Sequence, residues 1–148
     1  MSIPQIIEWF KKAVPEPTNR NFNTQLGCDL EELVEMLESL SGSTRESDER
    51  LVSFRELAHS FAESLKKGEV VLEVQDEVAF LDAACDRVVT TTGLATYLGM
   101  DFESALSEVN ASNWSKFDVD GNPIFDTNMK VQKGPNYWKP NLLPYVQK

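Results

Sequence analysis

The chain has 148 residues, of which 41% are hydrophobic and 26% are charged, and its formal net charge at pH 7 is −10. This length and composition suit a single globular domain with its own hydrophobic core. No apolar stretch approaches the roughly 18–20 residues of a membrane helix, and a strongly acidic chain lacks the basic patches that bind nucleic acids. We therefore expect one domain over residues 1–148 that binds neither membranes nor nucleic acids.

The first fourteen residues, MSIPQIIEWFKKAV, carry their lysines after the apolar positions. A secretory signal has the opposite order and ends in small residues at a cleavage site. We therefore expect the protein in the cytoplasm. In that reducing compartment Cys28 and Cys85, which lie within apolar helical patterns, are expected to remain thiols and to serve as small core residues.

Apolar residues recur at steps of three and four along five segments, which predicts an all-α fold. The predicted helices cover residues 3–14, 21–40, 47–67, 73–98 and 102–109. Phe54, Leu57 and Phe61 belong to the predicted buried stripe of the third helix, and Val78 and Leu81 to that of the fourth. We expect a helical bundle of about five helices and no strand.

Residues 114–148 differ in character, because prolines break any helical pattern there and the segment around Asp120 and Gly121 predicts a turn or a small hairpin. The aromatic residues of this tail predict that it packs on the bundle. Residues 1–113 carry 21 acidic and 9 basic side chains, whereas the tail carries 3 acidic and 5 basic ones. This division suits carboxylates that hold metal beside lysines that hold an anion, although a solvated acidic surface gives the same pattern.

Two predicted helices each carry a pair of carboxylates on one face. Glu32 and Glu35 are three positions apart on the second helix, and Asp82 and Asp86 are four apart on the fourth. If these helices pack antiparallel, the four carboxylates converge on a point where they need divalent cations that prefer oxygen ligands, Mg²⁺ or Mn²⁺. A single histidine makes zinc a poor fit.

Cations held by carboxylates leave positions that polyphosphate oxygens fill, and the usual chemistry there is attack of an activated water on phosphorus. Lys116, Lys130 and Lys133 lie in tail segments that are poor in acids, with Asn113 nearby as a hydrogen-bond donor. These residues are expected to bind the phosphates that the metal does not reach.

The chain resembles the MazG-like branch of the all-α nucleoside triphosphate pyrophosphohydrolases, in particular the small single-domain forms of bacteriophages. The resemblance spans residues 20–143 and rests on the ordered segments GCDLEELVEML, FLDAACDRVVTTTGLATYLGMD and SEVNASNWSKFDVDGNPIFDTNMKVQKGPNYWKPNL. It implies hydrolysis of a (deoxy)nucleoside triphosphate to monophosphate and pyrophosphate with two or three Mg²⁺ ions per site. It also implies a bundle completed by oligomerisation, as a homodimer or a homotetramer, and the host cytoplasm if a phage encodes the chain.

Carried over by position, Glu32 and Glu35 resemble the first metal-ligand pair and Asp86 the last ligand. Many relatives have a glutamate three residues before that aspartate, where this chain has Ala83, and Asp82 is expected to substitute for it. Glu35 is expected to orient the attacking water as well. Glu31 is expected to lie outside the metal ligands or in solvent.

The resemblance also implies a substrate-contacting set. Asn113, Lys116, Lys130 and Lys133 are expected to contact phosphates or sugar, and Tyr137 or Trp114 could stack on the base, although packing is the more common role for both aromatic residues. Asn21 and Gln25, one or two turns before the acid pair, are expected to reach sugar or base. The base itself is left open, with a preference for a purine such as dGTP or GTP.

Two other interpretations remain open. A non-catalytic acidic helical protein that imitates nucleic acid would spread its acids over exposed faces and would need no metal. The same metal site could instead act on phosphoribosyl-nucleotides. A panel of nucleotides assayed for released pyrophosphate would separate these alternatives.

Overall fold

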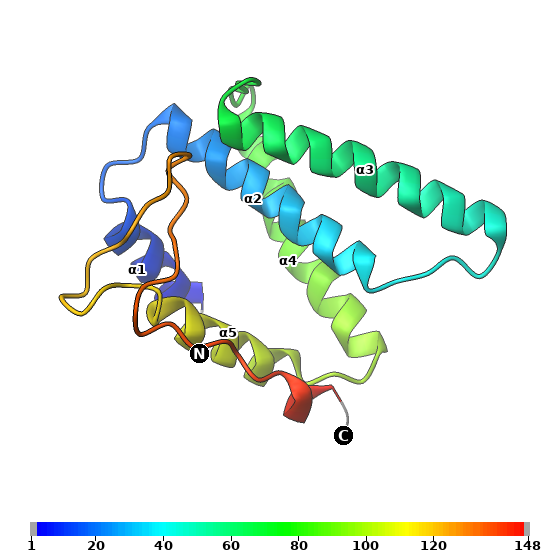
Figure 1. The fold of residues 1–148 in the computed structure, drawn as a ribbon. Helices are drawn as coiled ribbons and strands as arrows, with labels where there is room; N and C mark the ends of the chain where they lie inside the picture. Colours follow the sequence, from blue (N-terminus) through cyan, green and yellow to red (C-terminus); the bar gives the residue numbers. More distant parts are fainter. Residues whose placement is uncertain (1–2, 147–148) are drawn as a thin grey trace. The chain divides into compact units, whose positions relative to one another are not determined.

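The computed structural model describes residues 3–146 as an all-α protein without a β-strand in that range, which confirms the predicted fold class (Figure 1). The elements are α1 (Ile3–Ala13), α2 (Asn19–Glu38), α3 (Arg45–Lys67), α4 (Glu77–Tyr97), α5 (Phe102–Trp114) and the 3-10 turn η1 (Leu143–Tyr145). Among these described elements, no helix combines the length and apolarity needed to cross a membrane.

The helices begin and end where side chains or glycine cap them. α2 begins before the predicted position because Thr18 accepts a hydrogen bond from the Asn21 N–H, and the Asn21 side chain accepts one from the Thr18 N–H. α4 begins only after Asp76, whose side chain accepts from the Ala79 N–H. Gly68 ends α3 in the left-handed conformation, with a φ of 76°.

The described chain divides into two compact units, and the single domain expected from the sequence stays a prediction. Unit 1 contains α1, α4, α5 and η1, from the described residues of Met1–Glu16, Val74–Ile124 and Val131–Lys148. Unit 2 contains α2 and α3, from Pro17–Glu73, together with the tail segment Phe125–Lys130. The tail therefore contributes to both units.

In unit 2, α2 and α3 lie side by side through small residues (Figure 1). Ala62 and Leu65 of α3 are 0% exposed, and a Cβ at Gly27 of α2 would lie 2.8 Å from the Ala62 carbonyl oxygen. The predicted burial of Phe54, Leu57 and Phe61 is wrong, because α2 covers only a narrow strip of α3 and leaves them 51%, 70% and 41% exposed, respectively. The close approach of the backbones, rather than large side chains, defines this contact.

Unit 1 has an aromatic core around Trp9, Ala13 and Phe117, all of them buried. The Trp9 ring stacks on the Phe117 ring with centroids 5.6 Å apart, and the Trp9 Nε1 donates a hydrogen bond to the Asn113 carbonyl oxygen at 2.9 Å. This core ties α1 to the C-terminal end of α5.

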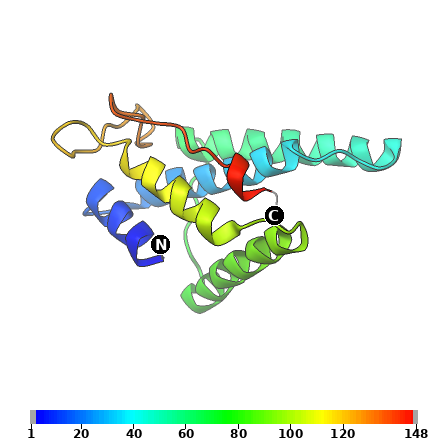
Figure 2. The same cartoon turned by 90° about the horizontal axis from the view of Figure 1, so that it is seen from below.

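The tail runs along α5 within unit 1, as the yellow helix and the orange-red tail of Figure 2 show. The Ser112 hydroxyl donates to the Trp138 carbonyl oxygen at 2.7 Å, and the Trp138 N–H donates to the Ser115 hydroxyl at 3.1 Å. Ser112 and Asn110 are buried, which explains why α5 continues past the predicted end at residue 109 although its last turn is polar.

None of the residues of α4 is buried, although the sequence predicts a buried seam along it. Within unit 1 this helix contacts α5 only at a few positions. The prediction that Val78, Leu81 and Cys85 are buried is therefore wrong, and Val78 and Leu81 are 80% and 65% exposed. A helix with this much exposed apolar surface has its stripe available to another surface.

Candidate functional site

The two predicted carboxylate pairs lie on the predicted helices, one in each unit. Glu32 and Glu35 are exposed on α2 in unit 2, and Asp82 and Asp86 are exposed on α4 in unit 1. Within residues 3–146, no group of three or more His, Cys, Asp or Glu side chains is placed to hold a metal ion. Because the four carboxylates are divided between the units, their convergence stays a prediction.

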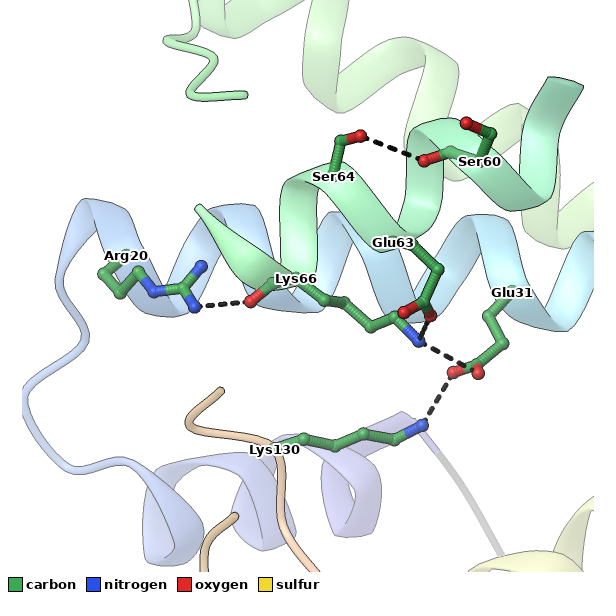
Figure 3. A network of polar contacts seen from close by, with 7 residues as sticks. All are labelled: Arg20, Glu31, Ser60, Glu63, Ser64, Lys66 and Lys130. Carbon is green, nitrogen blue, oxygen red and sulfur yellow. Dashed lines mark hydrogen bonds and ion pairs between the residues drawn. The ribbon is translucent and has the colours of Figure 1, made fainter. Parts of the chain in front are cut away.

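Next to the α2 pair, Glu31 joins two lysines from distant parts of unit 2 (Figure 3). Its Oε1 accepts a hydrogen bond from the Lys66 Nζ of α3 at 3.0 Å, and its Oε2 accepts one from the Lys130 Nζ of the tail at 2.6 Å. Lys66 also pairs with Glu63, one turn earlier on α3. Two carboxylates and two ammonium groups thus form one chain of ion pairs, the Glu31 network, made of Glu31, Glu63, Lys66 and Lys130.

The ion pairs of the Glu31 network favour the charged forms of Glu31, Lys66 and Lys130. Burial alone would raise the pKa of Glu31, but hydrogen bonds from Lys130 and Lys66 outweigh it and hold the pKa below its ordinary value. Burial likewise would lower the pKa values of Lys66 and Lys130, yet their carboxylate partners raise both. At neutral pH all the charges of the network are therefore present.

Hydrogen bonds to the backbone fix the position of Lys130 next to α2. The Asp126 side chain accepts hydrogen bonds from the N–H groups of Asn128 and Lys130, at 2.8 Å and 2.9 Å. The Thr24 hydroxyl of α2 donates to the Asn128 carbonyl oxygen at 2.9 Å. This turn holds the segment Phe125–Lys130 against α2, so that Lys130 is anchored by its backbone as well as by its side chain.

Most of the other predicted phosphate and base ligands gather around the C-terminal end of α5 in unit 1. The Gly134 N–H donates to the Lys116 carbonyl oxygen at 2.8 Å, which brings Lys133 and Tyr137 to the segment that carries Asn113 and Lys116. The Lys133 Nζ lies 4.8 Å from the centroid of the Tyr137 ring. The Lys116 Nζ lies 6.0 Å from the centroid of the Trp9 ring. Two lysines, an amide and an aromatic residue thus come from two segments joined by a hydrogen bond, and these residue types suit an anionic ligand with an aromatic base.

Trp114 and Asn21 have structural partners. The Trp114 ring lies edge-on to the Phe117 ring, with centroids 5.6 Å apart, and packs against the core of unit 1. The Asn21 side chain forms the N-terminal cap of α2 with Thr18. Gln25 is exposed on α2. The substrate roles of these three residues stay predictions.

Sequence reasoning missed Lys66, which reads as an ordinary basic residue at the end of a helix. It is 8% exposed, and its backbone carbonyl accepts a hydrogen bond from the Arg20 guanidinium. Gly27 offers a signal in retrospect, because a Cβ there would lie 2.7 Å from the Lys66 Cγ. A glycine within a helix otherwise rich in leucine and glutamate indicates close approach by a neighbour.

Comparison of the chain with known protein families, with curated proteins and with solved structures finds no match.

Proposed function

We propose that the protein is a Mg²⁺-dependent nucleoside triphosphate pyrophosphohydrolase that acts in the cytoplasm and releases pyrophosphate from a (deoxy)nucleoside triphosphate. One observation supports this most directly. On α2, the exposed carboxylates of Glu32 and Glu35 lie one and four positions after Glu31, which holds Lys130 at 2.6 Å. Two groups suited to a cation thus share a helix with the carboxylate that binds a lysine suited to a phosphate.

The donor set fits a hard cation. Carboxylate oxygens are the ligands that Mg²⁺ and Mn²⁺ prefer, and Glu32, Glu35, Asp82 and Asp86 would hold the ions. When bound, such ions neutralise the charge of the phosphate oxygens. Glu35 would accept a hydrogen bond from the attacking water and so orient it towards the phosphorus.

The region at the end of α5 supports the substrate side of the proposal. Lys116 and Lys133 would pair with phosphates, Asn113 would donate hydrogen bonds to phosphates or sugar, and Tyr137 would offer its ring to the base. Aromatic stacking tolerates any base, so the preference proposed for a purine is the part of this assignment that the contacts support least.

A panel of the common nucleotides with Mg²⁺, assayed for released pyrophosphate, tests the proposal. Glu35→Gln should abolish release while the helical circular dichroism spectrum stays unchanged, because the exposed side chain contributes little to packing. Glu38→Gln, an exposed position on the same helix, is the matched control and should retain activity. Activity retained by Glu35→Gln would refute the role assigned to this carboxylate.

The same panel separates the alternatives. Hydrolysis of a phosphoribosyl-nucleotide in place of the triphosphates would indicate the related reaction on the same fold. If no nucleotide releases pyrophosphate, with or without Mg²⁺, the result would favour an acidic binding protein whose exposed carboxylates imitate a nucleic acid.

We also propose that the chain forms a homodimer or homotetramer. The supporting observation is the apolar stripe of α4, which among the described elements of unit 1 only α5 contacts, at a few positions. Every copy of the chain carries the same stripe, so a symmetric, self-complementary contact between copies would bury it twice.

A further inference from the structure

We propose that Glu31 is a positioning residue that holds the Lys130 ammonium beside the acid pair of α2, where it meets the polyphosphate of the substrate, and that Lys66 fixes Glu31 for this task. The inference rests on the proposed function, since it assigns a ligand to Lys130. It adds two residues, Glu31 and Lys66, that neither bind metal nor contact substrate themselves.

The geometry of the Glu31 carboxylate supports the assignment. Each of its oxygens is used by a different lysine, Lys66 at 3.0 Å and Lys130 at 2.6 Å (Figure 3). A carboxylate engaged on both oxygens is a poor candidate for a metal ligand and a good anchor for an ammonium group.

The two lysines differ in exposure, and only Lys130 is accessible to a ligand. The Lys66 side chain is 9% exposed and has carboxylates of Glu31 and Glu63 as partners, whereas the Lys130 side chain is 41% exposed. An ammonium group has three N–H donors, so Lys130 can keep its bond to Glu31 and still donate to an incoming anion. Lys66 is enclosed and can only hold Glu31 in place.

The helix sets the distance between Glu31, which binds this ammonium group, and Glu35 of the acid pair. Glu31 and Glu35 are one turn apart on α2, with about 6 Å between their Cβ atoms. A triphosphate is long enough to meet cations at Glu32 and Glu35 with one phosphate and Lys130 with another. Without Glu31, the long lysine side chain would sample many rotamers and lose this placement.

Steady-state kinetics on the full chain test the proposal. Glu31→Gln and Lys130→Ala should each raise KM for the triphosphate roughly tenfold, while kcat stays within about threefold. The double variant should be no worse than Lys130→Ala alone, because Glu31 acts through Lys130. Lys130→Arg should restore most of the lost affinity. Glu49→Gln, in the exposed Arg45–Glu49 pair on α3, is the matched control and should leave KM unchanged.

Two measurements without turnover keep this inference separate from the proposed function. NMR titration of the lysine side chains should show that Glu31→Gln lowers the pKa of Lys130. Calorimetry with inorganic tripolyphosphate and Mg²⁺ should show weaker binding to Lys130→Ala and to Glu31→Gln than to the wild type. If no nucleotide is hydrolysed but both results hold, the proposed function fails and the positioning of Lys130 for a polyphosphate stands.

Three results would overturn the proposal. The first is a KM and a tripolyphosphate affinity that Glu31→Gln leaves unchanged. The second is additive effects in the double variant, which would mean that Glu31 does not act through Lys130. The third is an unaltered Lys130 titration in Glu31→Gln. If Glu31→Gln does not fold, Lys130→Ala and Lys130→Arg provide the decision, because the partly exposed Lys130 side chain can be replaced without opening the core.

Discussion

The Nζ of Lys130 lies 2.6 Å from the Oε2 of Glu31, although 99 positions separate the two residues in the sequence. Their contact fastens the segment Phe125–Lys130 to α2, with the Thr24–Asn128 hydrogen bond as a second attachment. Bringing such distant residues together costs chain entropy, which the ion pairs and the hydrogen bond offset. The tail therefore joins unit 2 through ion pairs and a hydrogen bond, whereas it joins unit 1 through the packing of Phe117 and hydrogen bonds with the end of α5.

The pH dependence of stability should reveal the Glu31 network. The pKa of Glu31 lies below its ordinary value of 4.5, so its contribution to stability is complete above pH 4.5 and is lost as the pH falls through the lower folded value. At pH 7, Glu31→Gln should lower the free energy of unfolding by about 1–2 kcal/mol. Urea unfolding of both proteins should show this difference shrinking as the solution is acidified below pH 4.5.

At high pH, the loss of charge from Lys66 and Lys130 ends the contribution of the network to stability. The pKa values of Lys66 and Lys130 are raised above 10.5, so the pairs persist until the pH rises through those folded values.

The control for Glu31→Gln is Glu46→Gln, in the exposed Glu46–Arg50 pair of α3, which should change stability by less than about 1 kcal/mol at any pH. A pH-independent difference between Glu31→Gln and the wild type would show that the network contributes no charge-dependent stability.

The sequence predicted the elements of the fold better than their packing. Hydrophobic periodicity located the five helices of residues 3–146, because it depends only on local spacing. It placed Phe54 and Leu57 in the core incorrectly, because periodicity does not tell how wide a strip the neighbouring helix covers. The contact of α2 with α3 depends instead on Gly27 and Ala62, which are too small to stand out in a hydrophobic pattern.

In the candidate site too, local features were predicted from the sequence and tertiary contacts were not. The exposed pairs Glu32–Glu35 and Asp82–Asp86 follow from helical spacing, and both lie on helices as predicted. The partners of Glu31 could not be predicted, because Lys66 and Lys130 reach it only through the tertiary contacts of unit 2. A long-range ion pair leaves no periodic signal in the chain.

Gly27 should tolerate no side chain. A Cβ there would lie 2.7 Å from the Lys66 Cγ and 2.8 Å from the Ala62 carbonyl oxygen, so Gly27→Ala must push α2 and α3 apart. We expect a loss of about 1–3 kcal/mol, although alanine favours helix over glycine by about 1 kcal/mol. Gly93→Ala is the matched control on α4, where a Cβ meets nothing within 4 Å, and should stabilise the protein. Chemical denaturation measures both, and equal effects would contradict the close contact.

Trp9 should be the tryptophan that matters most for unit 1. It is 8% exposed, stacks on Phe117 and donates a hydrogen bond to the Asn113 carbonyl oxygen, so Trp9→Phe loses packing and this hydrogen bond. The Asn113 carbonyl oxygen keeps the backbone N–H of Lys116 as a donor, at 3.1 Å. We expect a cost of about 1–3 kcal/mol in thermal or chemical unfolding. Trp138→Phe is the control, because Trp138 is 42% exposed. Its hydrogen bonds with the hydroxyls of Ser112 and Ser115 use the backbone atoms of Trp138, which the substitution keeps. A larger cost at Trp138 would contradict the assigned core.

The apolar stripe of α4 should mediate association between copies of the chain. Its large apolar side chains that share one face and are at least half exposed are Val78, Leu81, Val88 and Val89. They extend along about 18 Å of the helix. A stable dimer buries about 800 Å² on each partner, and this strip can supply part of that area.

Light scattering coupled to size-exclusion chromatography measures the outcome. The wild type should have a mass that is a multiple of 16.7 kDa, and the double substitution Leu81→Ser with Val88→Ser should shift the equilibrium towards the single chain. Val119→Ser, at a 74% exposed position of the tail, is the control and should leave the mass unchanged. A wild-type mass of 16.7 kDa at micromolar concentration would exclude the dimer and the tetramer, and would leave the α4 stripe for a different partner.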